Sequence, residues 1–260
     1  DELTRVASLQ AGQADVLDIG ANGRIANDMK AAGFNIISAK SGVNVLVPDS
    51  VNADSPWSNL KVRQAAEYAI DKESIVKTFG FGWTSAAYQL PSPSNPTYDP
   101  NFANVRKYDP EKAKQLLTEA GYPNGFKTKI FAQNTGNRDI PLAYKGMLDK
   151  VGIQTEVEFS DPAKFSTMSI NGKWNNGLLV FYIFEWPTYN YGLNLWFGVP
   201  TAWLQSLKKP DNWKDLLLAN LATPAYDKAS TQKLIRTMYD DATVIAIDYP
   251  AQLTATTSKV

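Results

Sequence analysis

The sequence predicts an α/β fold, and two observations carry the prediction. Residues 127–184 alternate between apolar stretches of strand length and stretches of helical periodicity, in the order strand, helix, strand, helix, strand. That order is typical of βαβ units, whose strands are covered by helices on both faces of the sheet. A chain of 260 residues, 44% of them hydrophobic, can also bury the core of one large domain or two small ones.

The first 50 residues follow the same alternation. We expect a helix at 3–12, a strand at 14–20, a helix at 22–33, a strand at 35–40 and an apolar stretch at 43–50. The polar, turn-rich segment that follows these elements, residues 51–59, indicates a boundary.

Clear start signals mark the helices in the middle of the chain. Residues 60–70 place their apolar side chains on one broad helical face, and Asp71 can cap a short helix after them. Asp109 and Pro110 form an N-cap followed by proline at the first helical position. Between these helices, residues 83–108 are rich in Pro, Ser and Asn, which predicts a long ordered surface loop.

The alternating region and the C-terminal part complete the expected elements. We expect strands at 127–133, 154–160 and 177–184, with helices at about 140–150 and at 162–172, the latter capped by Asp161. Trp186 and Pro187 should break the last of these strands, and the residues through Trp203 should form a loop. Two helices, at about 213–221 and 227–242, and an apolar strand at 243–249 should follow.

Composition excludes several classes of function. Lys plus Arg and Asp plus Glu number 26 each, and no stretch concentrates one sign, so a nucleic-acid track is not expected. No apolar segment reaches the roughly 20 residues of a membrane span, and the N-terminus lacks the pattern of a signal peptide. The chain has no Cys and no His, so thiolate chemistry, a zinc site and a Ser-His-Asp triad are excluded. We therefore expect neither an enzyme nor a bound metal or cofactor.

One carboxylate stands in an unusual place. Residues 181–198 hold eight aromatic side chains and a single ionisable carboxylate, Glu185, which is the only charged residue between Lys173 and Lys208. Burying a lone charge is strongly unfavourable. Glu185 also follows a predicted strand directly, and ligands of open α/β sheets bind outside the carboxyl ends of the strands. Glu185 is therefore either a ligand-binding residue or a rim residue paired with a Lys such as Lys173.

Alternation along the same strand sorts its aromatic side chains. Phe181 and Ile183 should face the core, whereas Tyr182, Phe184 and Trp186 should share the other face. Part of the aromatic set that follows the strand should line a cleft, and the rest should pack the following segment down. Exposed aromatic surface otherwise indicates a binding partner.

Three segments resemble a known family. The segments are SPWSNLKVRQAAEYAIDKESIV, YDPEKAKQLLTEAGYPNGF and KGMLDKVGIQTEVEFSDPAKF, in this order. They resemble the extracellular solute-binding proteins of peptide-type ABC importers, the family 5 or oligopeptide and dipeptide class. The second segment is the most specific, because of its Tyr-Asp-Pro start and its Gly-Tyr-Pro-Asn-Gly-Phe exit.

The resemblance implies a periplasmic-binding-protein-like (type II) architecture, in which two lobes close over a ligand. Residues 1–47, with 247–260 returning to them, resemble a remnant of the first lobe, and residues 48–246 resemble a complete second lobe. Most of the first lobe is then missing, so the chain looks like a fragment. The implied function is to bind peptides or another small cationic solute and to deliver it to ABC permease subunits in the membrane. The implied location is extracytoplasmic, either periplasmic or as a lipoprotein anchored on the cell surface.

The resemblance also implies a set of ligand-binding residues. Glu185 matches the family's acidic position, an Asp that pairs with the α-ammonium of the peptide, and Trp186, Phe184 and Tyr189 belong to the aromatic stretch around it. Glu in place of Asp is a departure, as is Thr188-Tyr189 in place of Asp-Pro, and both leave peptide specificity open. Where dipeptide binders carry an Arg for the ligand carboxylate, this chain offers Gln133 and then Arg138, which is otherwise a solvated residue of a first helical turn.

Two alternatives to a peptide binder remain open. An oligosaccharide-binding member of the same family would use the aromatic side chains together with Asn190 and Asn194 to stack against sugar rings. A standalone protein-interaction module would use the exposed face of the cleft. Neutralising Glu185 separates the first two classes, because a sugar binder should tolerate it and a peptide binder should not.

Overall fold

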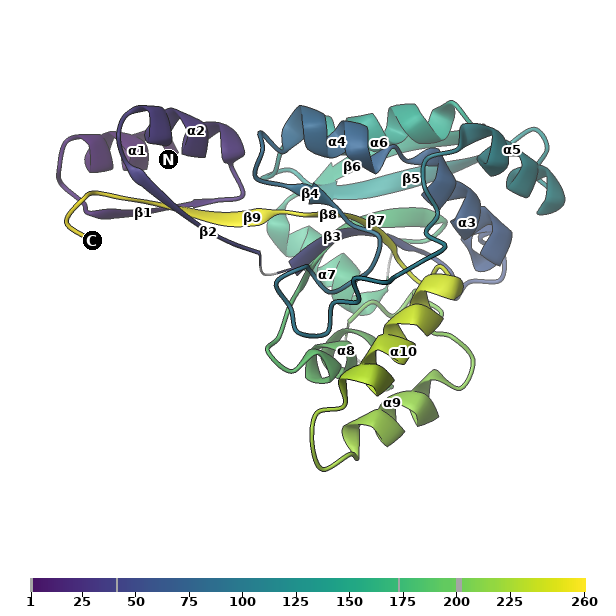
Figure 1. The fold of residues 1–260 in the computed structure, drawn as a ribbon. Helices are drawn as coiled ribbons and strands as arrows, with labels where there is room; N and C mark the ends of the chain where they lie inside the picture. The colour runs from purple at the N-terminus through teal and green to yellow at the C-terminus, as the bar shows by residue number, and fades with distance from the viewer. Residues whose placement is uncertain (1, 41, 173, 200–202) are drawn as a thin grey trace.

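The computed structural model describes residues 2–40, 42–172, 174–199 and 203–260, and it confirms the α/β class. The strands form two sheets, one of three strands in the order β1-β9-β2 and one of six in the order β4-β8-β3-β7-β5-β6. In Figure 1 the three-stranded sheet and the helices α1 and α2 beside it project from one side of the molecule, and both chain ends lie in this part. We call these two parts the small unit and the large unit.

The small unit packs two helices on its sheet. Its strands are β1 (Val16–Gly20), β2 (Asn35–Lys40) and β9 (Ala251–Thr256), and its helices are α1 (Glu2–Gln10) and α2 (Gly23–Ala31). Both outer strands pair antiparallel with β9, which returns from the large unit. Leu17, Ala26, Met29 and Leu253 form the centre of its core.

The large unit has a mixed sheet. Its strands are β3 (Gly42–Pro48), β4 (Ser85–Ala86), β5 (Phe126–Gln133), β6 (Ile153–Ser160), β7 (Gly177–Phe184) and β8 (Ile245–Tyr249). The expected βαβ order is confirmed, because β5 runs parallel to both β6 and β7. The other pairs, β3 with β7, β3 with β8 and β4 with β8, are antiparallel.

Strand pairing moves the expected boundary between the two parts. The sequence suggested a division near residue 47, which would leave β3 in the small unit. Instead, β3 pairs with β7 over its whole length, from Gly42 opposite Phe184 to Pro48 opposite Leu178. The chain therefore passes between the sheets just after Lys40 and again between Tyr249 and Ala251.

Helices cover both faces of the large sheet. One face carries the short helix η1 (Pro56–Ser58) with α3 (Leu60–Ala69), α4 (Lys72–Phe79), α5 (Pro110–Glu119) and α6 (Asp139–Asp149). The other carries α7 (Pro162–Asn171), α8 (Tyr189–Phe197), α9 (Trp213–Leu221) and α10 (Lys228–Asp240). The expected caps are confirmed, because Asp71, Asp109 and Asp161 each accept a hydrogen bond from a backbone N–H in the first turn. No helix in the described part of the chain is long and apolar enough to cross a membrane.

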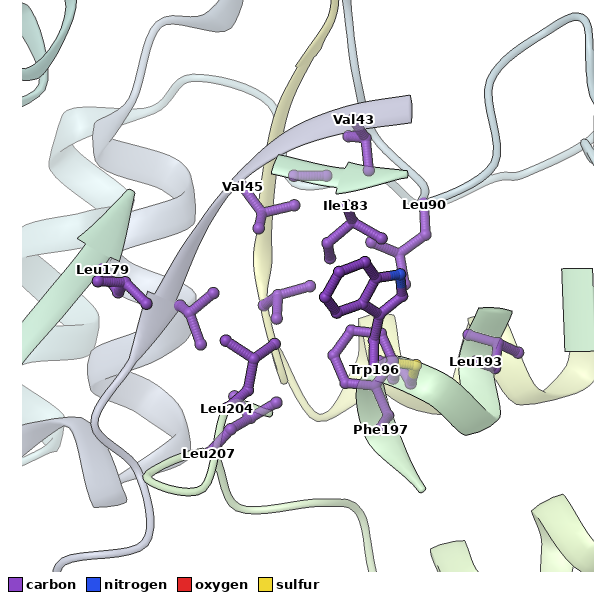
Figure 2. Packing of buried hydrophobic residues seen from close by; sticks show 14 of the residues in the cluster. Val43, Val45, Leu90, Leu179, Ile183, Leu193, Trp196, Phe197, Leu204 and Leu207 are labelled. Atoms are coloured by element: carbon purple, nitrogen blue, oxygen red, sulfur yellow. The ribbon is translucent and has the colours of Figure 1, made fainter. Parts of the chain in front are cut away.

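The segment after β7 differs from the expectation. We expected a loop from Pro187 through Trp203, but residues 189–197 form α8. The physical reason is a buried stripe at helical spacing, Tyr189, Leu193, Trp196 and Phe197. Figure 2 shows Leu193, Trp196 and Phe197 of α8 packed beneath Val43 and Ile183 of the sheet.

A buried ion cluster fixes the long loop of residues 83–108, in which the only strand among the described residues is the two-residue β4. Arg106 of the loop forms an ion pair with Glu67 of α3, and Lys72 of α4 lies 3.7 Å from the same carboxylate. Arg106 also donates to the carbonyl oxygen of Tyr239 in α10. Burial lowers the pKa of Lys72 to about 8, although the charge of Glu67 opposes that change. The loop is therefore tied to helices on both faces of the sheet.

Candidate functional site

A cleft of about 830 Å³ opens where strands β5 and β7 diverge. The two strands pair only from Lys129 to Phe131 of β5 and from Gly177 to Leu179 of β7. Beyond that point, Ala132 and Gln133 of β5 and residues 180–182 of β7 line the cleft. The helices α6 and α7, which follow β5 and β6, pack on opposite faces of the sheet. This is the position at the carboxyl ends of the strands that the sequence indicated.

The small unit contributes a wall of the same cleft. Residues 19 and 21–23, at the turn from β1 into α2, line it together with Phe79 and Phe81 of the large unit. Asn27 of α2 holds this wall in place, because its side chain donates to the carbonyl oxygen of Phe81 at 3.1 Å and accepts from Nε1 of Trp83 at 2.8 Å. The cleft therefore lies between the two units.

Aromatic rings form one side of the cleft. Phe181 lies 5.5 Å from Trp196 and 6.4 Å from Trp203 between ring centroids, and Trp196 lies 5.4 Å from Trp203. All three pairs are edge-on or tilted, which is the geometry that aromatic quadrupoles favour. We call Phe181, Trp196 and Trp203 the ring cluster.

Polar side chains form the floor of the cleft. Asn44 of β3 and Tyr144 of α6 both line it. Behind them lies Asp248 of β8, which is 6% exposed and accepts hydrogen bonds from Nδ2 of Asn44 at 3.1 and 3.3 Å. Burial raises the pKa of Asp248 to about 6, opposed by the bond from Asn44 and by the charge of Lys40. The pKa of Tyr144 is raised by burial and by the neighbouring charge of Asp248.

Glu185 lies outside the lining of this cleft, one residue beyond Phe184, which belongs to it. The carboxylate accepts a hydrogen bond from the backbone N–H of Ser92 and one from Oγ of Ser92, the latter at 2.9 Å. Burial raises the pKa of Glu185, while Ser92 and Asn95 oppose that change. Within the described residues no cation pairs with it. Lys173, the suggested partner, lies outside the described residues.

The other residues expected to bind ligand fall into two groups. Gln133 and Phe184 line the cleft, and Phe184 is 54% exposed. The other four do not line it: Trp186, Tyr189, Asn190 and Arg138. Tyr189 is buried at the start of α8, Trp186 packs edge-on against Tyr191 and the Arg138 guanidinium lies 4.2 Å from the centroid of Phe159.

Sequence analysis missed the floor of the cleft. Asp248 is a lone carboxylate in the apolar strand TVIAIDY, the same signal that drew attention to Glu185, so it could have been found in the same way. Asn44 and Tyr144 carry no such signal, because their neighbours in space are distant along the chain. In the described part of the chain, no group of three or more Asp or Glu side chains is arranged to hold a metal ion.

Comparison with known proteins places this chain in a family. Residues 1–213 match the family model described as bacterial extracellular solute-binding proteins, family 5 middle. The heme-binding protein A of Haemophilus influenzae is 34% identical over 87% of this chain, and the glutathione-binding protein GsiB of Escherichia coli O1:K1 / APEC is 30% identical over 70%. The aligned region spans only 40% and 36% of these two relatives.

Solved structures show the same fold. HbpA2 of Haemophilus parasuis matches with a TM-score of 0.83 at 22% identity, over 99% of this chain and 52% of that one. The periplasmic binding protein DppA of Helicobacter pylori, in complex with the peptide STSA, matches with a TM-score of 0.81 at 24% identity, over 100% of this chain and 52% of that one. The chain thus spans about half of each structure. With the family model covering most of its length, the chain belongs to the family 5 extracellular solute-binding proteins.

Proposed function

We propose that this chain is the ligand-binding part of the substrate-binding component of an ABC importer. It captures a small organic solute in the cleft and delivers it to permease subunits in the membrane, without chemical change to the solute. The observation that carries the proposal is the cleft of about 830 Å³ between two units that the chain joins by only two crossings. A site walled by both units can open and close when the hydrogen bonds of Asn27 with Phe81 and Trp83 break and the units move about those crossings. An extracytoplasmic location, periplasmic or lipoprotein-anchored, accompanies this function.

We propose a peptide-like solute with a cationic group as the ligand, and Glu185 as the residue that pairs with that group. A half-buried carboxylate that only neutral donors hold can still accept an ammonium, which would offset the cost of its burial. Two proteins that this chain resembles support this choice: GsiB is named for binding glutathione, and DppA was solved with the peptide STSA. Both ligands are peptides that carry an ammonium group.

An oligosaccharide is the second candidate ligand, and one observation favours it. The cleft residues in the described part of the chain carry no charged side chain and combine aromatic rings with Asn and Gln amides. Aromatic faces and amides are also what a sugar ring requires. The two candidates differ in their dependence on Glu185, as the sequence already suggested.

Isothermal titration calorimetry on the protein in its native full-length form tests the proposal. The panel contains Ala-Ala-Ala, the same peptide with an acetylated N-terminus, and cellotriose. Binding of the free peptide, lost on acetylation and weakened at least tenfold by Glu185→Gln, is the expected result. Tighter binding of cellotriose would favour the second candidate. If no peptide and no sugar binds, the proposed function fails.

A further inference from the structure

The lining of the cleft, within the described residues, restricts the charge of the ligand groups that it can bind. None of its side chains is Asp, Glu, Lys or Arg, although the charged residues Lys40, Asp248 and Glu185 lie close behind it. A charged side chain of a ligand that entered this space would lose its hydration without meeting an opposite charge in the lining. The lining therefore selects against charge in the part of the ligand that it contacts.

The ring cluster adds a preference for aromatic ligand groups. Phe181, Trp196 and Trp203 are held edge-on or tilted to one another, and Phe165 of α7 lines the cleft on the same side. Aromatic pairs in such arrangements gain energy beyond the burial of their area. A further ring placed against this cluster would gain both terms, whereas an aliphatic group would gain only the burial term.

The floor supplies one acceptor and one donor. The carboxylate of Asp248 can only accept when ionised, so the NH₂ group of Asn44 donates to it, and Oδ1 of Asn44, a residue that lines the cleft, is the atom left to accept from a ligand. Tyr144, whose side chain is almost wholly buried, lines the cleft, and no described residue hydrogen-bonds its hydroxyl. At the surface of the cleft this hydroxyl is therefore available to a ligand group. A peptide group carries the matching N–H and C=O.

We propose that this half of the cleft is a subsite for an aromatic residue of a peptide-like ligand. Its ring packs on the ring cluster, and its peptide group pairs with Oδ1 of Asn44 and the hydroxyl of Tyr144. This inference rests on the proposed function and narrows its ligand class. It also gives Glu185 and the cleft lining different roles, because Glu185 pairs with the ammonium group of the ligand and the uncharged lining binds its aromatic side chain.

The probes are the tripeptides Ala-Phe-Ala, Ala-Leu-Ala, Ala-Lys-Ala and Ala-Glu-Ala, titrated calorimetrically into the native full-length protein. We expect Ala-Phe-Ala to bind at least tenfold more tightly than the Lys and Glu peptides and severalfold more tightly than the Leu peptide. Equal or tighter binding of a charged peptide would overturn the subsite and leave the proposed function standing. Failure of all four peptides to bind would overturn both.

Variants separate the ring cluster from the floor. Trp203→Leu should remove most of the preference for Phe, whereas Tyr108→Leu, an exposed aromatic outside the cleft lining, should leave it intact. Tyr144→Phe deletes an unpaired hydroxyl, so it should weaken all four peptides severalfold and leave the urea unfolding midpoint unchanged. Equal preferences in the Trp203 and Tyr108 variants, or unchanged affinities in the Tyr144 variant, would refute the assigned contacts. Thermal unfolding curves confirm that each variant is folded.

Discussion

Replacing Asp248 by Asn should stabilise the protein at neutral and alkaline pH and have no effect near pH 4. In the folded state burial raises the pKa of Asp248 from 3.8 to about 6, against the opposing effects of Asn44 and Lys40. An acid with a raised folded pKa stabilises the fold only while it is protonated. Its contribution is therefore complete below about pH 4 and is lost as the pH rises through about 6. The difference between the two pKa values corresponds to about 3 kcal/mol.

The substitution isolates this group because Asn has nearly the same shape as protonated Asp. Its amide oxygen can still accept from Nδ2 of Asn44, which lies 3.1 Å from the native carboxylate. Urea unfolding of both proteins at pH 4, 5, 6, 7 and 8 gives the difference in free energy of unfolding at each pH. We expect that difference to grow from near zero at pH 4 to about 2–3 kcal/mol in favour of the Asn variant at pH 8.

A second variant checks the cause. Lys40 is the cation that opposes the raised pKa of Asp248, so Lys40→Met should raise that pKa further and steepen the loss of stability between pH 5 and 7. A difference between wild type and Asp248→Asn that stays flat from pH 4 to 8 would refute the reasoning. A less stable Asn variant at pH 8 would do the same, because it would show that attraction to Lys40 outweighs the cost of burial.

Three further predictions concern other parts of the molecule. Glu185→Gln should weaken cationic peptides by about 2–5 kcal/mol in calorimetry. Ser92→Ala removes the hydrogen bond from Oγ of Ser92 but keeps the backbone N–H bond and the charge of Glu185, so it should weaken them much less; similar losses would contradict a role in charge recognition. Glu67→Gln should lower the free energy of unfolding in urea by about 3–5 kcal/mol, because it leaves Lys72 and Arg106 buried without a counter-charge. A loss below about 1 kcal/mol would show that these two cations do not depend on Glu67. Gly125→Ala should be far more destabilising than Gly121→Ala in thermal unfolding. Both glycines have positive φ, but only at Gly125 would the new Cβ meet a backbone oxygen, at 1.8 Å. Comparable losses of stability in the two variants would contradict the steric argument.

Much of the fold follows from local signals. The caps at Asp71, Asp109 and Asp161 and the order of β5, α6, β6, α7 and β7 were all readable, because a cap or a strand-helix alternation involves neighbours in sequence. The position of the cleft at the carboxyl ends of these strands follows from their order alone.

Other features depend on partners that are distant along the chain. The segment of α8 was predicted to be a loop because Trp186 and Pro187 break the strand before it, although Leu193, Trp196 and Phe197 have helical spacing. The boundary near residue 47 was misplaced because only the pairing of β3 with β7 reveals which sheet it joins. The partner strand of β3 cannot be read from a single sequence, whereas the helical spacing within α8 could.

Glu185 and Asp248 carry the same sequence signal, a lone carboxylate at the end of an apolar strand, yet the structure gives them different surroundings. Asp248 is nine-tenths buried, bonded to a side chain that lines the cleft and within the influence of Lys40. Glu185 is half-buried, and among the described residues its hydrogen bonds come from neutral groups of the 83–108 loop. An entering ammonium would therefore gain more at Glu185, because no cation there already opposes it and less protein must be displaced to reach the carboxylate. A lone carboxylate in an apolar stretch of sequence is therefore a poor candidate for ligand pairing when it is completely buried. It is a good candidate when it is partly buried beside the cleft.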